Sequence, residues 1–261
     1  MSERAERLDK LARDGEERRL LARVWDKLES ARRGSPAHTF FLSVPQQEAA
    51  LRLIAAEGHP RHLFSGGWGG AERKVCAFLP DWQEEEHWEA PFTALRCRWR
   101  SGEKLTHRDF LGAILGQGID REKVGDLLVG EGTCDLLVFR ELCPYLLQNF
   151  SEAGRARLQV EEVPLSALSA PEVQVKTIHD TVNTLRLDAV MASGFSLGRS
   201  KAAGLITGGR VELNHRPCLK PDRPVAQGDV ITCRGLGKCV AAEVGGLSKK
   251  GRVILTLERY I

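Results

Sequence analysis

The spacing of apolar residues predicts a helix near the start of the chain. Apolar side chains recur there every three or four positions, and arginine and acidic side chains fill the positions between them, as in an amphipathic helix. Gly34 and Pro36 end this pattern. We therefore expect an N-terminal helix within residues 1–35, and its buried face consists of Leu20, Leu21, Val24, Trp25 and Leu28.

The next segment, residues 36–90, is expected to be a small α+β subdomain. An acidic stretch at 82–89 and the following Pro91 predict its boundary. The patterns indicate strands at 38–44, 61–64 and 74–79 and a helix from Pro45 to Gly58.

Residues 91–165 follow the order β-α-β-β-α-β. This order is that of the ferredoxin-like plan, which many RNA-recognition folds share and which also supports unrelated functions. Thr106 and Asp109 have the spacing of a capping box at the start of the first of its helices. The expected elements are strands at 92–99, 126–129, 134–139 and 157–163 and helices at 107–115 and 141–153.

A linker is expected at 166–180 and a separate module at 181–261. The module begins with a helix that buries Leu187, Val190 and Met191. Ser196 is expected to cap a second helix that runs to about Ile206. A strand at 210–215 and further short strands up to residue 260 complete an overall α+β fold class.

The charge of the chain is unevenly distributed. Residues 181–261 contain 13 Lys and Arg against 6 Asp and Glu, a balance of +7, whereas residues 1–180 contain 25 against 29, a balance of −4. A compact basic module on an otherwise mildly acidic protein is typical of a polyanion-binding domain.

Composition excludes several other classes of protein. No segment has the roughly 18 uncharged residues of a membrane helix, and the charged N-terminus resembles no targeting signal, so we expect a cytoplasmic protein without membrane contact. The seven cysteines form no C-x-x-C pair, which predicts buried free thiols and no metal site. Neither a P-loop ending nor a dinucleotide fingerprint occurs, so we expect no cofactor and no small-molecule substrate.

The segment 184–235 resembles the αL RNA-binding motif, which is named after a small-subunit ribosomal protein. The shared positions are Arg186-Leu187-Asp188, Arg199-Ser200, Gly209-Arg210-Val211, Asn214 and Gly228-Asp229. Together with 106–129 and 234–260, it resembles the YlmH-like family of RNA-binding proteins from residue 36 to the end. This resemblance implies association with the large ribosomal subunit and with the rescue of stalled nascent chains, where peptidyl-tRNA is held.

Within the αL module, basic side chains are the candidate RNA contacts, because Lys and Arg neutralise phosphates without reading bases. Arg199 and Lys201 lie about 200° apart around their helix and cannot share a face, and Lys201 is the better placed at the rim. Arg186 is equally well explained as a structural partner of Asp188. The full set of candidates is Arg186, Arg199, Lys201, Arg210, Arg216 and Lys220.

The middle domain offers two further basic groups. Arg108, Arg121 and Lys123 flank a Gly116–Gly118 turn that could present three cations together. Arg96, Arg98 and Arg100 alternate along a strand, and we favour their pairing with nearby acids over contact with RNA. The acids nearest in sequence are Glu84, Glu85, Glu86 and Glu89.

The resulting hypothesis is a non-enzymatic protein that binds structured RNA, either rRNA of the large ribosomal subunit or tRNA, in the quality control of stalled nascent chains. The alternative is an RNA-modifying enzyme of the pseudouridine synthase or methyltransferase type, in which the αL module delivers the substrate. Residues 36–165 contain no convincing catalytic set or cofactor loop for that alternative.

Overall fold

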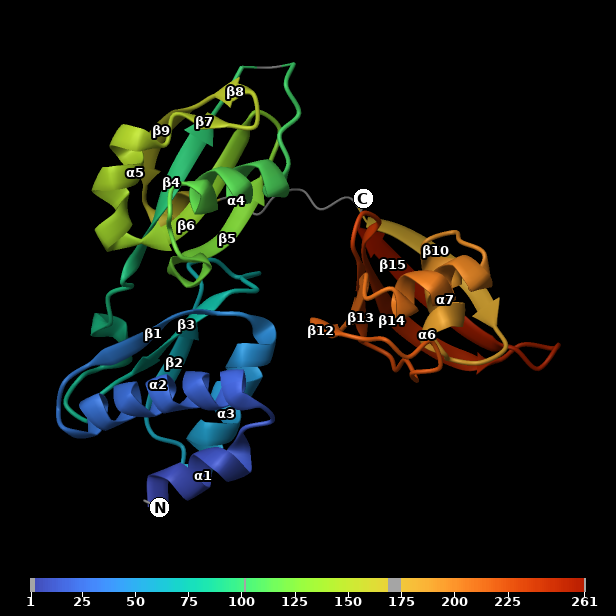
Figure 1. Cartoon of the computed structure of the whole chain (residues 1–261), viewed down its shortest axis with the longest axis horizontal. Coiled ribbons are helices and arrows are strands. Elements are labelled where there is room, and N and C mark those ends of the chain that lie inside the picture. The colour runs from blue at the N-terminus through green and yellow to red at the C-terminus, as the bar shows by residue number, and fades with distance from the viewer. Residues whose placement is uncertain (1–2, 101, 169–174, 261) are drawn as a thin grey trace. The chain divides into compact units, whose positions relative to one another are not determined.

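The computed structural model describes residues 3–100, 102–168 and 175–260. The chain divides into two compact units, residues 1–171 and 172–261, and each has its own hydrophobic core. Figure 1 shows both units as mixtures of helices and strands. This confirms the α+β fold class.

The first part of unit 1 is a three-stranded antiparallel sheet of order β1-β3-β2, with helices α2 and α3 packed against it (Figure 1). The predicted apolar face of α2 is buried, and Asp14 caps this helix by accepting a hydrogen bond from the backbone N–H of Glu17 at 2.8 Å. The elements are α1 (Glu3–Leu11), α2 (Gly15–Arg32), β1 (Ala37–Leu42), α3 (Val44–Ala56), β2 (His62–Ser65), β3 (Lys74–Phe78) and the 3₁₀ turn η1 (Glu85–His87).

The N-terminal segment differs from the prediction in two respects. It contains two helices, and the additional helix α1 escapes a periodicity argument because only Leu8 of its nine residues is buried. Leu8 and Leu21 also share one core with Leu53 and Phe78. The described parts of 1–35 and 36–90 therefore share one hydrophobic core, in which the helices cover the sheet.

The middle part of unit 1 has the ferredoxin-like topology that was predicted. Its antiparallel sheet has the order β5-β6-β4-β9, and α4 and α5 cover one face (Figure 1). The Thr106–Asp109 capping box is present, with the Thr106 N–H donating to Asp109 at 2.8 Å. The elements are β4 (Phe92–Arg98), α4 (His107–Gly116), η2 (Arg121–Lys123), β5 (Val124–Val129), β6 (Thr133–Phe139), η3 (Arg140–Leu142), α5 (Cys143–Asn149), β7 (Glu152–Ala153), β8 (Ala156–Arg157), β9 (Gln159–Val163) and η4 (Leu165–Ala167).

The predicted helix at 141–153 is too long. α5 ends at Asn149, and a small β7–β8 hairpin follows, with Gly154 in its turn at a φ of 58°. Glycine tolerates this left-handed conformation, which a continuous helix does not contain. The hairpin also moves the start of the last strand from the predicted residue 157 to Gln159.

The helix-free face of the middle sheet is closed by the first sheet. Phe92, Leu137 and Phe139 form a buried cluster with Phe41 and Val75 of the N-terminal part. RNA-recognition folds commonly stack bases on aromatic side chains of this open sheet face. Here that face is part of the core of unit 1, so base stacking on it is blocked.

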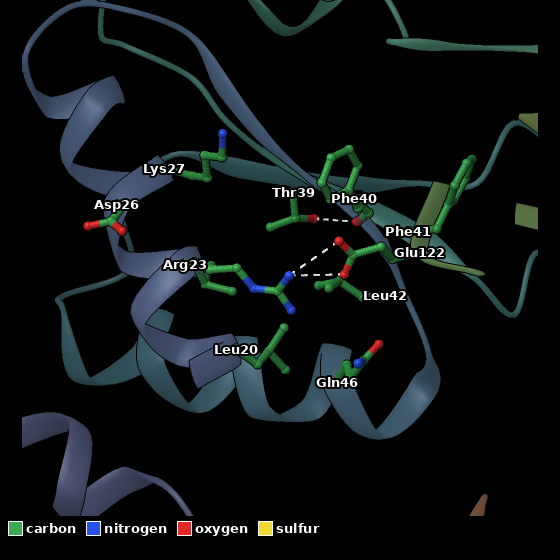
Figure 2. Close-up of a pocket in the computed structure, with 11 residues that line it drawn as sticks. Leu20, Arg23, Asp26, Lys27, Thr39, Phe40, Phe41, Leu42, Gln46 and Glu122 are labelled. Carbon is green, nitrogen blue, oxygen red and sulfur yellow. Dashed lines mark hydrogen bonds and ion pairs between the residues drawn. The ribbon is translucent and has the colours of Figure 1, made fainter. Parts of the chain in front are cut away.

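A pocket of about 310 Å³ lies between α2 and β1. Figure 2 shows the Arg23 side chain extending across it toward Glu122 of η2, and the two form an ion pair at 3.0 Å. Arg23 and Glu122 are 99 residues apart in the chain. The pair thus links the N-terminal helices to the middle domain within unit 1.

Unit 2 contains a six-stranded antiparallel sheet of order β10-β15-β14-β13-β11-β12, and α6 and α7 pack against it (Figure 1). The predicted apolar residues Leu187, Val190 and Met191 are fully buried in this core. The elements are β10 (Val175–Val182), α6 (Leu187–Gly194), α7 (Arg199–Thr207), β11 (Val211–Leu213), β12 (Arg216–Pro217), β13 (Val230–Cys233), β14 (Gly237–Leu247) and β15 (Val253–Tyr260).

Three local predictions in this region need correction. Residues 175–180, placed in the linker 166–180, belong to β10, which pairs with β15 along its whole length; residues 169–174 of that linker lie outside the described residues. Ser196 is not a helix cap, because its φ of 54° places it in a turn and Gly198 takes the N-cap position. The strand expected at 210–215 stops at Leu213, where the chain reverses direction toward β12.

Candidate RNA-binding interface

Asp188 organises the start of the αL module. Its side chain is 7% exposed and forms ion pairs at 3.2 Å with both Arg186 and Arg199. Burial alone would raise the pKa of Asp188, but hydrogen bonds and charge from the two arginines outweigh it and lower this pKa below its ordinary value. The carboxylate therefore stays ionised and brings the two arginines together, although they are 13 positions apart in sequence.

A loop adds two further cations to this cluster. The backbone N–H of Asp188 donates to the Pro221 carbonyl at 2.9 Å, and the N–H of Leu187 donates to the Arg223 carbonyl at 2.8 Å. These bonds hold the loop that carries Lys220 and Arg223 against the start of α6. We define the basic cluster as Arg186, Arg199, Lys220 and Arg223; Asp222 within this loop also contributes to the raised pKa of Arg186, after the Asp188 hydrogen bond.

Arg223 was not among the predicted contacts. The only sequence signal for it is its position in the K-P-D-R-P stretch, and charge alone does not show that this stretch returns to α6. The returning path becomes visible only through the backbone bonds to Leu187 and Asp188.

Lys201 lies in the first turn of α7 and is exposed. No acidic side chain occupies that turn, and no partner for the Lys201 ammonium group is found among the described residues. A helix N-terminus carries a partial positive charge and attracts phosphate. Neither Lys201 nor Lys220 forms an ion pair among the residues that the structure describes.

Arg210 follows the C-terminal end of α7, whereas Arg199 of the basic cluster lies at the N-terminal end of this helix. Its guanidinium group donates to the Arg234 carbonyl at 2.9 Å, and the Arg234 N–H donates back to the Arg210 carbonyl at the same distance. Arg216 is half-buried on β12, next to the tight turn at Asn214 and His215. These two predicted contacts are therefore not brought together with Arg186 and Arg199 by any bond of the cluster.

Of the three predicted cations in the middle domain, two have internal partners. Arg121 donates to the carbonyls of Val124 at 2.5 Å and Gly125 at 3.2 Å, and burial lowers its pKa. Lys123 forms an ion pair with Glu141 at 2.8 Å. Arg108 is exposed at the start of α4, at the opposite end of this helix from the glycine turn, so the three cations are not presented together.

Two of the three alternating arginines, Arg96 and Arg98, are paired as favoured, but with other acids than those nearest in sequence, whereas Arg100 has no ion pair among the described residues. Arg96 makes a bidentate ion pair with Asp135 on β6, with both bonds at 2.7 Å. Arg98 pairs with Glu161 on β9. Sheet register sets the first partner, because Asp135 lies directly opposite Arg96 on β6. Glu161 also lies opposite Arg96, on β9, and Arg98 reaches it diagonally from its own register position opposite Gln159.

The cysteines are free thiols, as predicted, and six of the seven are buried, Cys218 being half-buried. Burial raises the pKa of Cys76 to about 12 and that of Cys239 to about 11, which keeps them protonated and unreactive at neutral pH. Within the described residues, no group of three or more His, Cys, Asp or Glu side chains is arranged to hold a metal ion. The helices of the described residues include none that is long and apolar enough to span a membrane.

Comparisons with known proteins agree with these two modules. A family model described as a putative RNA-binding domain in YlmH matches residues 100–167, and one described as the S4 domain matches residues 185–231. The chain is 32% identical over 216 residues to the "Ribosome-associated protein quality control protein P2" of Bacillus subtilis (strain 168), covering 82% of this chain and 84% of that relative.

Among solved structures, the chain is similar to the "Cell division protein ylmH" from Streptococcus pneumoniae. The TM-score is 0.50 at 22% sequence identity, and the match covers 59% of this chain and 95% of that one. At this identity the similarity concerns the fold. The basic cluster lies within the segment that matches the S4 domain, which is an RNA-binding domain of the αL type.

Proposed function

Because the chain belongs to the YlmH-like family of RNA-binding proteins, we propose that it binds structured RNA on the large ribosomal subunit, rRNA or peptidyl-tRNA, in the quality control of stalled nascent chains. It does so without catalysis, as a cytoplasmic binding protein. The relative from Bacillus subtilis is named as a ribosome-associated quality control protein, which supports this role.

The basic cluster is the observation that carries the proposal. Asp188 neutralises only one of the charges of Arg186 and Arg199, and their side chains remain 41% and 53% exposed, respectively. Lys220 and Arg223 are exposed on the loop whose backbone is bonded to the start of α6, next to Asp188 in the fold. A group of cations fixed in place by a buried acid is a prepared site for the phosphate backbone of a folded RNA.

The test uses the full chain and purified large ribosomal subunits. Lys201→Glu/Lys220→Glu reverses two exposed charges that form no ion pair among the described residues, so we expect folding to be preserved while two phosphate contacts become repulsive. We expect co-sedimentation with large subunits to weaken by about tenfold or more near 150 mM salt, and the dependence of binding on salt to lose a slope of about 2.

A matched control is Lys10→Glu/Lys27→Glu, which makes the same charge change on exposed positions of α1 and α2 in unit 1. This variant should bind large subunits as the unmodified protein does. Equal co-sedimentation of both double variants, or binding that does not respond to salt, would show that the αL module is not the ribosome-binding surface.

A further inference from the structure

A second basic pocket lies at one end of the middle domain. It has a volume of about 750 Å³, within the usual range for ligand sites, and is formed where β4 ends next to the β7–β8 hairpin. Figure 1 shows β7 and β8 beyond this end of the sheet. The lining residues are Arg98, Trp99, Arg100, Glu103, Arg155, Ala156, Arg157, Leu158 and Gln159. Four of these side chains are arginines and one is acidic.

Three of the arginines are exposed, and their side chains have no ion-pair or hydrogen-bond partner among the described residues: Arg100, Arg155 and Arg157. Arg98 differs, because Glu161 neutralises it. Glu152 is the acid that faces Arg157 across the hairpin in the strand register, and it forms no ion pair with it. The pocket therefore has an excess of positive charge that the fold itself does not use.

The pocket also has an apolar wall. Trp99 is half-buried, its indole N–H donates to the Glu103 carbonyl at 2.8 Å, and its ring packs on Phe110 at 5.4 Å between centroids. Leu158 lines the same pocket. A fixed aromatic ring beside guanidinium groups is the combination that binds unpaired nucleotides, because bases stack on the ring while arginines bind phosphate.

The buried face of the middle sheet also bears on where this domain could contact RNA. Phe92, Leu137 and Phe139 occupy the face on which RNA-recognition folds usually stack bases, and they are buried. If this domain contacts RNA, the contact has to be made elsewhere on its surface. The pocket is a surface of the middle domain that combines unneutralised arginines with an aromatic side chain.

We propose that this pocket binds an unpaired segment of RNA, with Arg100, Arg155 and Arg157 on successive phosphates and a base against Trp99. The proposal rests on the RNA-binding function proposed above and adds a second contact with a different RNA form. Recognition depends on single-stranded character, because a base must leave its stack to reach the Trp99 wall.

The test compares two RNAs by fluorescence anisotropy with the full chain: a 12-nucleotide strand without self-complementarity, and a 12-base-pair duplex. Arg100→Gln/Arg155→Gln/Arg157→Gln should weaken binding of the unpaired strand about tenfold or more and reduce its salt slope by about 2, since each single-strand phosphate contact contributes about 0.7. Binding of the duplex should change less than about twofold.

The matched control replaces three exposed arginines in or next to α2, Arg13→Gln/Arg19→Gln/Arg33→Gln, and should leave both affinities unchanged. An equal loss with this control, an unchanged affinity of the pocket variant for the unpaired strand, or an equal loss for the duplex overturns the assignment.

Tryptophan fluorescence provides an independent readout of the same binding. Unit 2 contains no tryptophan, so quenching by the unpaired strand should come from unit 1, and Trp99→Phe should remove it while retaining most of the affinity. Quenching that survives in Trp99→Phe contradicts the proposal. If the pocket proposal fails but large-subunit binding still depends on Lys201 and Lys220, the function proposed above stands. If the pocket binds the unpaired strand as expected but large-subunit binding does not depend on Lys201 and Lys220, only the function proposed above is refuted.

Discussion

Asp188 is the acid that orients Arg186 and Arg199, the arginines of unit 2 that we propose as RNA contacts. It is buried, and its only charged partners among the described side chains are Arg186 and Arg199. The sequence suggested the Arg186–Asp188 pair from their proximity, and this pair is confirmed. It did not suggest the Arg199 pair, because that contact depends on how α6 and α7 pack.

Asp188→Asn should destabilise unit 2 moderately. The amide is of similar size but carries no charge, so both arginines lose their ionic partner, and because they are about half exposed, water compensates in part. We expect a loss of about 1–2 kcal/mol in the free energy of unfolding, measured by urea titration followed by far-UV circular dichroism.

The pH dependence of the Asp188→Asn effect provides a check. The pKa of Asp188 in the folded protein is lowered below its ordinary value of 3.8, so its contribution is present above about pH 4 and is lost as pH falls further. The difference between the parent and Asp188→Asn should therefore shrink between pH 6 and pH 3. A difference that stays constant would show that Asp188 acts through packing alone.

Other residues illustrate why side-chain roles were harder to predict than residue types. Arg121 and Lys123 looked like solvent-facing cations because a glycine turn precedes them in the sequence. The Arg121 guanidinium group instead folds back onto the carbonyls of Val124 and Gly125. Lys123 pairs with Glu141 and lies over the Phe40 ring at 5.6 Å. Charge and spacing show neither the local fold of the Arg121 side chain nor the contact of Lys123 with a strand of the N-terminal part.

At the scale of elements, the loop before β3 joins the two halves of unit 1. Asp126 on β5 accepts hydrogen bonds from the backbone N–H groups of Glu72 at 2.8 Å and Arg73 at 3.1 Å. The Arg73 guanidinium group donates to the carbonyls of Val124 at 3.0 Å and Phe41 at 2.9 Å. Burial lowers the pKa of Arg73 to about 10, so it remains charged at neutral pH.

Arg73→Met should weaken the contact of the loop before β3 with β1 and β5. Methionine retains much of the aliphatic volume but donates no hydrogen bonds, so partly buried carbonyls lose their donor. We expect the free energy of unfolding of unit 1 to fall by about 1–3 kcal/mol, measured by urea titration with tryptophan fluorescence. Arg33→Met, at an exposed position, is the control and should change it by less than about 0.5 kcal/mol. Equal effects of the two changes would contradict a bridging role for Arg73.

Elements with local signals were predicted well. α4 has its capping box and apolar face within ten residues, and the order of the middle domain follows from such segments. The β7–β8 hairpin was missed because each of its strands has two residues, too few for any alternation to be seen. That hairpin carries Arg155 and Arg157, so the second pocket was out of reach of a periodicity argument.

At the scale of the whole molecule, the chain consists of two units with separate cores. Unit 2 buries Leu187, Met191, Ile206 and Ile231 in a core of its own. The sequence predicted this division from the charge asymmetry, but it placed the start of the module too late, because β10 is largely polar and exposed and resembles a linker.

The two cores should unfold independently, and the position of the tryptophans makes this measurable. All five tryptophans, Trp25, Trp68, Trp82, Trp88 and Trp99, belong to unit 1, so their fluorescence reports that unit, whereas far-UV circular dichroism reports both. We expect the two probes to give non-coincident urea transitions, which is the established sign of behaviour that is not two-state.

The variants described above then identify each transition. Arg73→Met should lower the urea midpoint of the fluorescence transition, which reports unit 1. Asp188→Asn should lower only the midpoint of the second circular dichroism transition, which reports unit 2 and is not seen by fluorescence. In the double variant the two effects should add within about 0.5 kcal/mol, because the changes lie in different cores and share no partner. Coincident transitions, or a fluorescence midpoint that moves with Asp188→Asn, would mean that the units fold as one. The salt-dependent binding by unit 2 would then depend on the integrity of unit 1 as well as on its own basic cluster.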